Sequence, residues 1–195
     1  MIIMTNKLKL DHGAWRMTKT ITTFYLITLF IANTMWPFSA KADTTLNIGD
    51  EAPAFELVDQ YNKIHKLSDY QGKWLVLYFY PKDDTPGCTT EACNFRDDIF
   101  KLHALDAEVM GISLDSAESH AAFSEKYGLP FPLLSDSDAS IAKKYDCLTS
   151  IGPLKFAKRH TFIISPDGKL AKIYRQVKPK SHTAEVIAEL ELLQL

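Results

Sequence analysis

Two cysteines five residues apart, Cys88 and Cys93, are the side chains in this sequence best suited to chemistry. Cys88 follows an apolar run that ends at a proline, where a helix is expected to begin. Thr85 is a suitable N-cap and Pro86 a suitable first helical residue, so Cys88 occupies the third helical position. Free backbone N–H groups and the positive end of the helix dipole favour a thiolate there. We therefore interpret Cys88 as a candidate nucleophile.

The spacing of the two cysteines predicts a helix that must open. On an intact helix, residues five apart are separated by about 140° around the axis and by roughly 8.6 Å between Cα atoms. A disulfide needs Cα atoms within about 7 Å. A bond between Cys88 and Cys93 therefore requires the first turns to unwind, which predicts a wound reduced state and an unwound oxidised state. The spacing also differs from a Cys-x-x-Cys dithiol, and no second Cys/His pair follows that would complete a zinc site.

The segments around this motif predict an α/β domain. Residues 74–80 form a nearly unbroken apolar run, as in a central strand that is covered on both faces. Helical and strand-like segments alternate after it, and hairpin signals at both ends of the domain add antiparallel strands to a parallel core. The expected hairpins span residues 55–67 and 160–174. One long helix is expected to follow Cys88 through residue 102, and further helices are expected at residues 117–127, 140–145 and about 181–193. Residues 152–153 are expected to be a loop.

The first 42 residues differ from the rest of the chain. A basic head precedes a short apolar run at residues 21–31, and Ala40-Lys41-Ala42 supplies a small-x-small pattern after it. These are the parts of a secretory signal peptide. We expect residues 1–42 to be removed and a mature domain of residues 43–195 to be periplasmic or otherwise exported. Met17 is an alternative start, and an uncleaved membrane anchor is the alternative interpretation.

Charge and cysteine content limit the partners. The whole chain has a formal net charge of −2, and loss of residues 1–42 removes five basic and one acidic residue, which leaves −6. A net negative domain disfavours nucleic acid as a partner and offers no basic patch to a membrane surface. Three cysteines are too few for a disulfide-stapled secreted scaffold. Cys147 is expected to be a small buried apolar residue.

The motif Pro81-x-x-x-Thr85-x-x-Cys88 resembles the active-site signature of the peroxiredoxins, and residues 80–93 are similar to their bacterioferritin-comigratory, or PrxQ, subfamily. The resemblance runs from about residue 48 to the C-terminus. It implies a thioredoxin-like fold, with a central mixed β-sheet flanked by helices, and the reduction of hydrogen peroxide and organic hydroperoxides. It also implies that no metal or organic cofactor is needed, that a thioredoxin-like protein is the reductant, and that the chain is a monomer. No stable membrane partner is expected after cleavage of the signal peptide.

Carried over by position, the resemblance makes Cys88 the peroxidatic cysteine and Cys93 the resolving cysteine. Thr85 would hydrogen-bond the peroxide and the thiolate, and Pro81 would shield the pocket. Arg159, just before a Thr-Phe strand, would stabilise the thiolate and the charge that develops on the oxygens. The same cysteine pair would also serve a thiol-disulfide oxidoreductase or a peroxide sensor, and a non-enzymatic binding role is a third alternative.

Three nearby residues have simpler interpretations. Arg96 is close enough in sequence to be the charge partner instead of Arg159, although a surface or packing contact fits it better. Glu91 is expected on a solvated helix face. His160 follows Arg159 directly, and strand alternation should send the two side chains to opposite faces.

Overall fold

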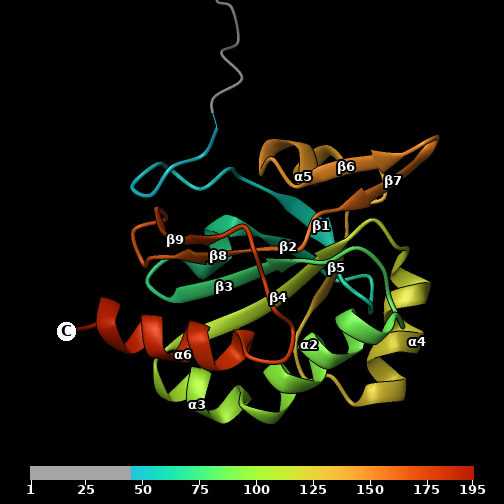
Figure 1. Ribbon diagram of the computed structural model, residues 1–195. Helices are drawn as coiled ribbons and strands as arrows, with labels where there is room; N and C mark the ends of the chain where they lie inside the picture. Colours follow the sequence, from blue (N-terminus) through green and yellow to red (C-terminus); the bar gives the residue numbers. More distant parts are fainter. Residues whose placement is uncertain (1–44) are drawn as a thin grey trace, which may run out of the picture. The chain divides into compact units, whose positions relative to one another are not determined.

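The computed structural model describes residues 45–195, and the expected signal peptide lies outside this part of the chain. A mixed sheet of seven strands forms its centre, in the order β2-β1-β5-β4-β3-β8-β9 (Figure 1). The neighbours β3, β4 and β5 run parallel, whereas the other pairs are antiparallel. These strands are β1 (Glu56–Val58), β2 (Ile64–Lys66), β3 (Trp74–Phe79), β4 (Ala107–Ser113), β5 (Leu133–Ser135), β8 (His160–Ile164) and β9 (Leu170–Tyr174).

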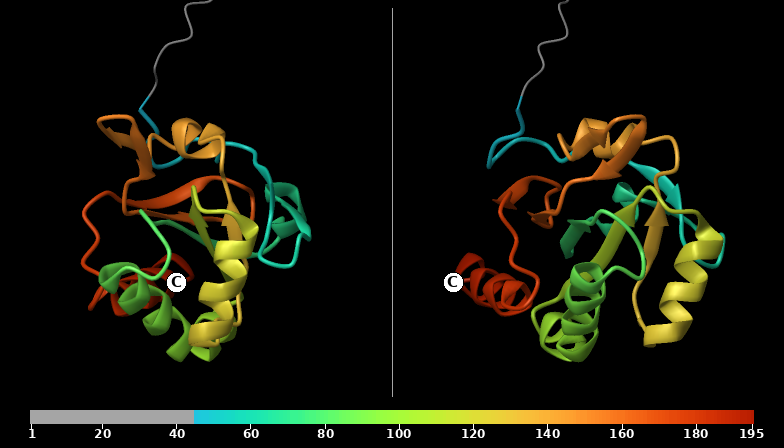
Figure 2. Two further views of the ribbon diagram at one scale, coloured as in Figure 1. Left: turned by 90° about the vertical axis from the view of Figure 1, so that its right-hand side faces the viewer. Right: turned by 45° about the vertical axis from the view of Figure 1, so that its right-hand side comes forward.

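Helices cover both faces of this sheet. They are α2 (Pro86–Asp97), α3 (Ile99–Ala104), α4 (Ala117–Tyr127), α5 (Ser140–Lys144) and α6 (His182–Leu193), and a 3-10 helix, η1 (Leu67–Tyr70), follows β2. Figure 1 shows α2, α3, α4 and α6 on one side of the sheet and α5 on the other, and both views in Figure 2 agree. The predicted parallel core, with antiparallel hairpins β1–β2 and β8–β9 added to it, is confirmed.

Strand β3 carries the core on both faces, as its apolar run predicts. Val76 and Tyr78 belong to the apolar cluster that contains α2, α3, α4 and α6 residues. Leu75, Leu77 and Phe79 belong to the second cluster, with α5 on the opposite face. Each of these side chains is at most 1 % exposed, so the strand directly before the cysteine motif is rigidly held.

The ends of α4 follow the expected capping chemistry. Ser116 is its N-cap and accepts a hydrogen bond from the Ser119 N–H, and Gly128 ends it in the left-handed region with φ of 61°. Helix α6 likewise begins after Ser181, as expected. These local signals therefore placed two helices correctly.

One expectation about the elements is wrong in detail, and one hairpin was not predicted. The predicted long helix is divided at Asp98 into α2 and α3, although both parts bury the predicted apolar stripe. Adjacent aspartates, Asp97 and Asp98, have low helix propensity and lie unfavourably near the negative end of a helix. Residues 152–153 form a loop, as expected, but this loop is the turn of a separate hairpin that the sequence did not predict, β6 (Leu148–Ile151) and β7 (Leu154–Ala157).

Candidate active site

Cys88 lies at the third position of α2, after Thr85 as N-cap and Pro86 as first residue. Its side chain is 1 % exposed and packs in the apolar cluster with Tyr78 and Tyr80. Thr85 does not cap the helix with its side chain; its hydroxyl donates instead to the Lys82 carbonyl at 3.0 Å. The thiol is thus sheltered from bulk water at the N-terminal end of a helix.

Arg159 approaches this sulfur from another part of the chain. It directly precedes β8, and β8 pairs with β3, whose end leads to the cysteine motif. Its Nη2 donates to the Cys88 Sγ at 3.2 Å. A Cβ at position 87 would lie only 3.2 Å from that nitrogen, so Gly87 leaves the space through which the guanidinium reaches the thiol. The structure therefore brings the two predicted site residues into contact.

Glu91 is not on a solvated helix face, so that expectation is wrong. Its side chain is fully buried, and its Oε2 accepts a hydrogen bond from Arg159 Nη1. Burial raises the pKa of Glu91 to about 7, against the opposing effect of the Arg159 charge. Glu91 lies three residues after Cys88 and therefore on the same side of α2. That spacing is the sequence signal by which Glu91 could have been found.

The guanidinium of Arg159 thus links the buried carboxylate to the buried sulfur. Burial alone would lower its pKa, but Glu91 and Cys88 together raise the pKa of Arg159 above its ordinary value. The guanidinium stays charged in this setting, because its two ends meet an anion and a sulfur that accepts its hydrogen bond. The arrangement supplies positive charge next to the candidate nucleophile.

A groove with mainly apolar walls opens beside Thr85. Pro81 and Thr85 form one side of it, and the β6–β7 hairpin and the segment after it form the other. The hairpin contributes exposed Ile151, which is 73 % accessible. The lining residues are Pro81, Lys82, Thr85, Thr149, Ile151, Phe156, Ala157 and Lys158. The hairpin that the sequence did not predict therefore shapes the approach to the site.

Known proteins match this chain in sequence and in fold. A family model described as "AhpC/TSA family" matches residues 48–173. The chain belongs to the AhpC/TSA family. It is 47 % identical to "Peroxiredoxin Bcp" of Bacillus subtilis over 155 residues, which cover 75 % of this chain and 96 % of that relative. It is 40 % identical to "Putative peroxiredoxin bcp" of Coxiella burnetii over 152 residues, covering 75 % and 99 %.

Solved structures of peroxiredoxins have the same fold. PrxQ of Xylella fastidiosa matches with a TM-score of 0.74 and 37 % identity, over 78 % of this chain and 99 % of that one. The bacterioferritin comigratory protein of Xanthomonas campestris, whose structure is titled for its alkyl peroxide reduction activity, matches with a TM-score of 0.69 and 34 % identity, over 72 % and 92 %. The chain is therefore a thiol-dependent peroxidase of the Bcp/PrxQ type, an oxidoreductase with a thioredoxin-like fold.

The second cysteine of this peroxiredoxin lies on the same helix. Cys93 is half-buried in α2, and Cys88, Cys93 and Cys147 are all free thiols. Asn94, the next residue, donates to the carbonyls of Pro179 and Lys180 at 3.0 and 3.4 Å. This contact fastens the last turn of α2, directly after Cys93, to the segment before α6.

Cys147 lies on the other face of the sheet. It is fully buried in the cluster with α5, whereas Cys88 belongs to the cluster with α2, and burial raises the pKa of the Cys147 thiol. Its Sγ lies 3.5 Å from Nδ1 of His160, whose own pKa burial lowers to about 4. His160 and Arg159 thus point to different faces, as strand alternation requires. The expectation that Cys147 is a small buried residue is confirmed.

Arg96, the alternative charge partner, is engaged elsewhere. Its Nη1 donates to the Tyr127 carbonyl at 2.6 Å, and its Nε donates to Asp97. This is the packing contact expected from the sequence. Within residues 45–195, no helix has both the length and the apolar character of a membrane span, and no three His, Cys, Asp or Glu side chains gather to hold a metal ion.

Proposed function

We propose that Cys88 attacks the hydroperoxide and that Cys93 resolves the product. The thiolate of Cys88 bonds to one peroxide oxygen, the O–O bond breaks, and the other oxygen leaves as hydroxide or alkoxide, which takes up a proton. The sulfur becomes a sulfenic acid. The Cys93 thiol then attacks that sulfur, water leaves, and a Cys88–Cys93 disulfide forms. A thioredoxin-like protein reduces the disulfide with its own dithiol, which returns both thiols.

The observation that carries this proposal is the contact between Arg159 and the Cys88 sulfur at the N-terminal end of α2. A fixed cation beside the sulfur stabilises the thiolate and the negative charge on the departing oxygen. Thr85, the N-cap of the same helix, has a hydroxyl whose hydrogen is already donated to Lys82, so its oxygen can accept the peroxide O–H. Pro81 lines the groove beside it and limits the entry of water.

Burial of Cys88 favours peroxidase chemistry over disulfide exchange as its first step. With a side chain 1 % exposed, Cys88 cannot meet a protein disulfide on the surface, whereas a small hydroperoxide needs only a narrow approach. The adjoining apolar groove offers a place for the organic part of a larger hydroperoxide. A protein partner becomes relevant only after α2 unwinds, when the oxidised sulfur is exposed to the reductant. A monomer suffices for this sequence, because both cysteines belong to one helix.

A variant with Cys93 replaced by serine tests the division of roles. Cys88 should then react once with hydrogen peroxide or an organic hydroperoxide and stop as sulfenic acid, because no nearby thiol can displace the hydroxyl group. Turnover with thioredoxin as the donor should therefore be lost, while the first oxidation keeps its rate. Mass spectrometry with a sulfenic acid trap follows the product. Full turnover with thioredoxin in this variant would refute the role of Cys93.

We also propose that the domain of residues 43–195 acts after export, with residues 1–42 as its signal peptide. The basic head, the apolar run and the Ala40-Lys41-Ala42 pattern support this. The reductant must then be a thioredoxin-like protein of the same compartment. The intact mass of the protein isolated from cells tests the proposal: cleavage before Asp43 is expected, and retention of the first 42 residues would contradict it.

A further inference from the structure

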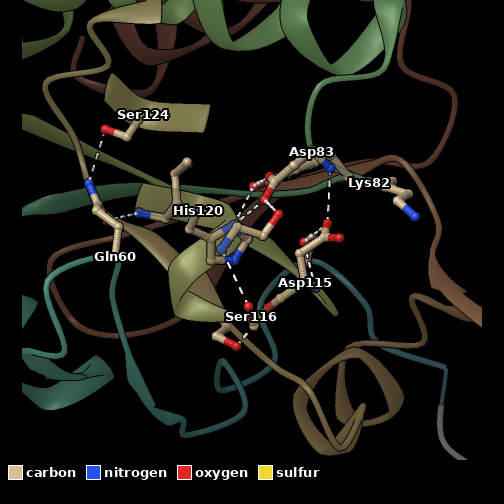
Figure 3. Close-up of polar contacts among 12 residues, drawn as sticks. Gln60, Lys82, Asp83, Asp115, Ser116, His120 and Ser124 are labelled. Carbon is tan, nitrogen blue, oxygen red and sulfur yellow. Dashed lines mark hydrogen bonds and ion pairs between the residues drawn. The ribbon is translucent and has the colours of Figure 1, made fainter. Parts of the chain in front are cut away.

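A buried polar cluster lies beneath the turn that joins β3 to α2. Asp83, in this turn, is 7 % exposed, and His120 of α4 is fully buried. His120 Nδ1 lies 2.8 Å from one carboxylate oxygen of Asp83, and its Nε2 lies 3.2 Å from the Leu134 carbonyl in β5. Figure 3 shows the two side chains facing one another. Both ring nitrogens meet acceptors, so His120 bridges the turn to the sheet.

The carboxylate of Asp83 has several further donors. The Tyr80 hydroxyl donates to Oδ1 at 2.7 Å, and the Ser119 hydroxyl donates to Oδ2 at 2.7 Å. The Asp83 N–H donates to Asp115 at 2.9 Å, as Figure 3 shows. Burial opposes ionisation, but His120 and the other donors hold the pKa of Asp83 below its ordinary value. A carboxylate with this many partners fixes its own backbone in one position.

The following residue is also fastened to α4. Asp84 has a φ of 55°, which is uncommon for a residue other than glycine. Its carboxylate accepts hydrogen bonds from Lys126 at 2.7 and 2.8 Å and from the Tyr127 hydroxyl at 2.6 Å. The contacts of Asp84 lie on the exposed surface, whereas those of Asp83 are buried. The buried contacts are therefore the stronger restraint on the turn.

Asp83 and Asp84 lie between two residues that are joined by a hydrogen bond, Lys82 and Thr85. Thr85 donates its hydroxyl hydrogen to the Lys82 carbonyl, on the other side of Asp83 and Asp84. The position of that carbonyl, and with it the direction of the Thr85 hydroxyl, depends on how the turn is held. We propose that His120 is a positioning residue for the peroxidase reaction: through Asp83 it fixes the turn that orients the Thr85 hydroxyl toward the hydroperoxide beside Cys88.

This inference rests on the proposed roles of Cys88 and Thr85 and predicts how substitutions at position 120 should differ. In His120→Asn the amide nitrogen takes the place of Nδ1 and keeps a donor toward Asp83. In His120→Gln the amide nitrogen reaches the place of Nε2, so the bond to Asp83 is lost. The two variants therefore separate the contact with the turn from the contact with Leu134.

The chain offers a matched control in a second buried His–Asp pair. His65 and Asp59 are 5 % and 4 % exposed, and their side chains meet at 2.9 Å. This pair joins β2 to the turn after β1 and has no hydrogen bond to the cysteine motif. In His65 it is Nε2 that meets Asp59, while Nδ1 meets the Tyr70 hydroxyl. His65→Asn therefore removes a buried His–Asp contact of the same kind, so it reports the effect of lost stability alone.

The test compares two reactions of Cys88 in the same full-length preparation. Oxidation by hydrogen peroxide needs an oriented Thr85, whereas alkylation by iodoacetamide needs only an accessible thiolate. Both can be followed by fragment masses that distinguish Cys88 from Cys93 within their common peptide. The ratio of the two rate constants should fall about tenfold in His120→Gln, since small misplacements near reacting atoms have effects of this order. It should fall about threefold or less in His120→Asn, the size of one weakened hydrogen bond. It should be unchanged in His65→Asn.

An unchanged ratio in His120→Gln, or an equal fall in His65→Asn, would overturn the inference. If His120→Gln does not fold, Ser119→Ala removes one donor from the same carboxylate at a half-buried position. Its ratio should fall about threefold, as one lost hydrogen bond implies, and an unchanged ratio would again overturn the inference. Failure of the wild-type protein to oxidise Cys88 would instead contradict the proposed function, so the two failures are distinguishable.

Discussion

Replacing Cys88 by serine should abolish hydroperoxide consumption, whereas replacing Cys147 by serine should leave its rate unchanged. A serine hydroxyl is not ionised at neutral pH, and the Arg159 guanidinium is a cation that cannot take its proton. Cys147 is a matched control because it is also buried, but in the cluster on the opposite face of the sheet. Peroxide loss in the presence of a dithiol donor measures both variants.

The outcome distinguishes this account from its competitors. If Cys88→Ser kept its rate, the contact between Arg159 and the sulfur would have no part in the peroxidase reaction. If Cys147→Ser lost its activity while remaining folded, a thiol on the far face of the sheet would be required. Circular dichroism of each variant shows whether folding is retained.

Replacing Arg159 by methionine should lower the rate constant for Cys88 oxidation by about 100-fold, the usual effect of removing a fixed charge or donor from a transition state. Methionine keeps an unbranched apolar stem of similar length but cannot donate to the Cys88 sulfur or pair with Glu91. Stopped-flow measurement of thiol oxidation at pH 7 gives the rate. A fall of less than about threefold, the size of one ordinary hydrogen bond, would remove Arg159 from the mechanism.

A double variant separates catalysis from folding. Arg159→Met leaves the Glu91 carboxylate buried without its cation, which is destabilising. Burial already raises the pKa of Glu91 from an ordinary 4.5 to about 7. A carboxyl whose pKa is raised by folding stabilises the fold below its unfolded value and loses this contribution as the pH rises through its folded value. As the pH rises from about 4.5 through 7 and above, the free energy of unfolding of the single variant should therefore fall more steeply than that of the wild type.

Adding Glu91→Gln to Arg159→Met should reduce that pH dependence, because glutamine has no charge to bury. The rate should not recover, since no cation returns to the Cys88 sulfur. Chemical denaturation at several pH values gives the free energy of unfolding for each variant. Recovery of the rate together with the stability would show that Arg159 acts only by satisfying Glu91.

Local patterns predicted most of the fold. The apolar run of β3, the Ser116 and Gly128 caps of α4 and the Pro-Asp-Gly turn between β8 and β9 depend on neighbours in sequence, so their structure follows from local chemistry. The β6–β7 hairpin did not follow, because its strands alternate weakly and are partly exposed. The division of the helix at Asp98 was hidden by an apolar stripe that continues through both parts.

The residues of the candidate site that belong to a motif were predicted from the sequence. Those whose role depends on burial were missed. From the sequence, Glu91 is expected at the surface. Its burial depends on Arg159, 68 positions later, which donates a hydrogen bond to it. In the sequence Asp83 is likewise a turn residue, and its role follows from His120, 37 positions later, which pairs with it. Whether a charged side chain can be buried depends on a partner brought by the tertiary fold. The spacing from Cys88 to Glu91 places both on one side of a helix, but the local sequence does not identify the partner.

The central claim is that α2 serves two states, with Cys88 sheltered in the wound helix and joined to Cys93 after it unwinds. One measurement tests it most directly: the reduced wild-type protein is treated with one equivalent of hydroperoxide, digested without reductant, and mapped by mass spectrometry. The account predicts a disulfide between Cys88 and Cys93, with Cys147 left as a free thiol. A bond from Cys88 to Cys147 or to a second chain, or a sulfenic acid that persists beside a free Cys93, would contradict it.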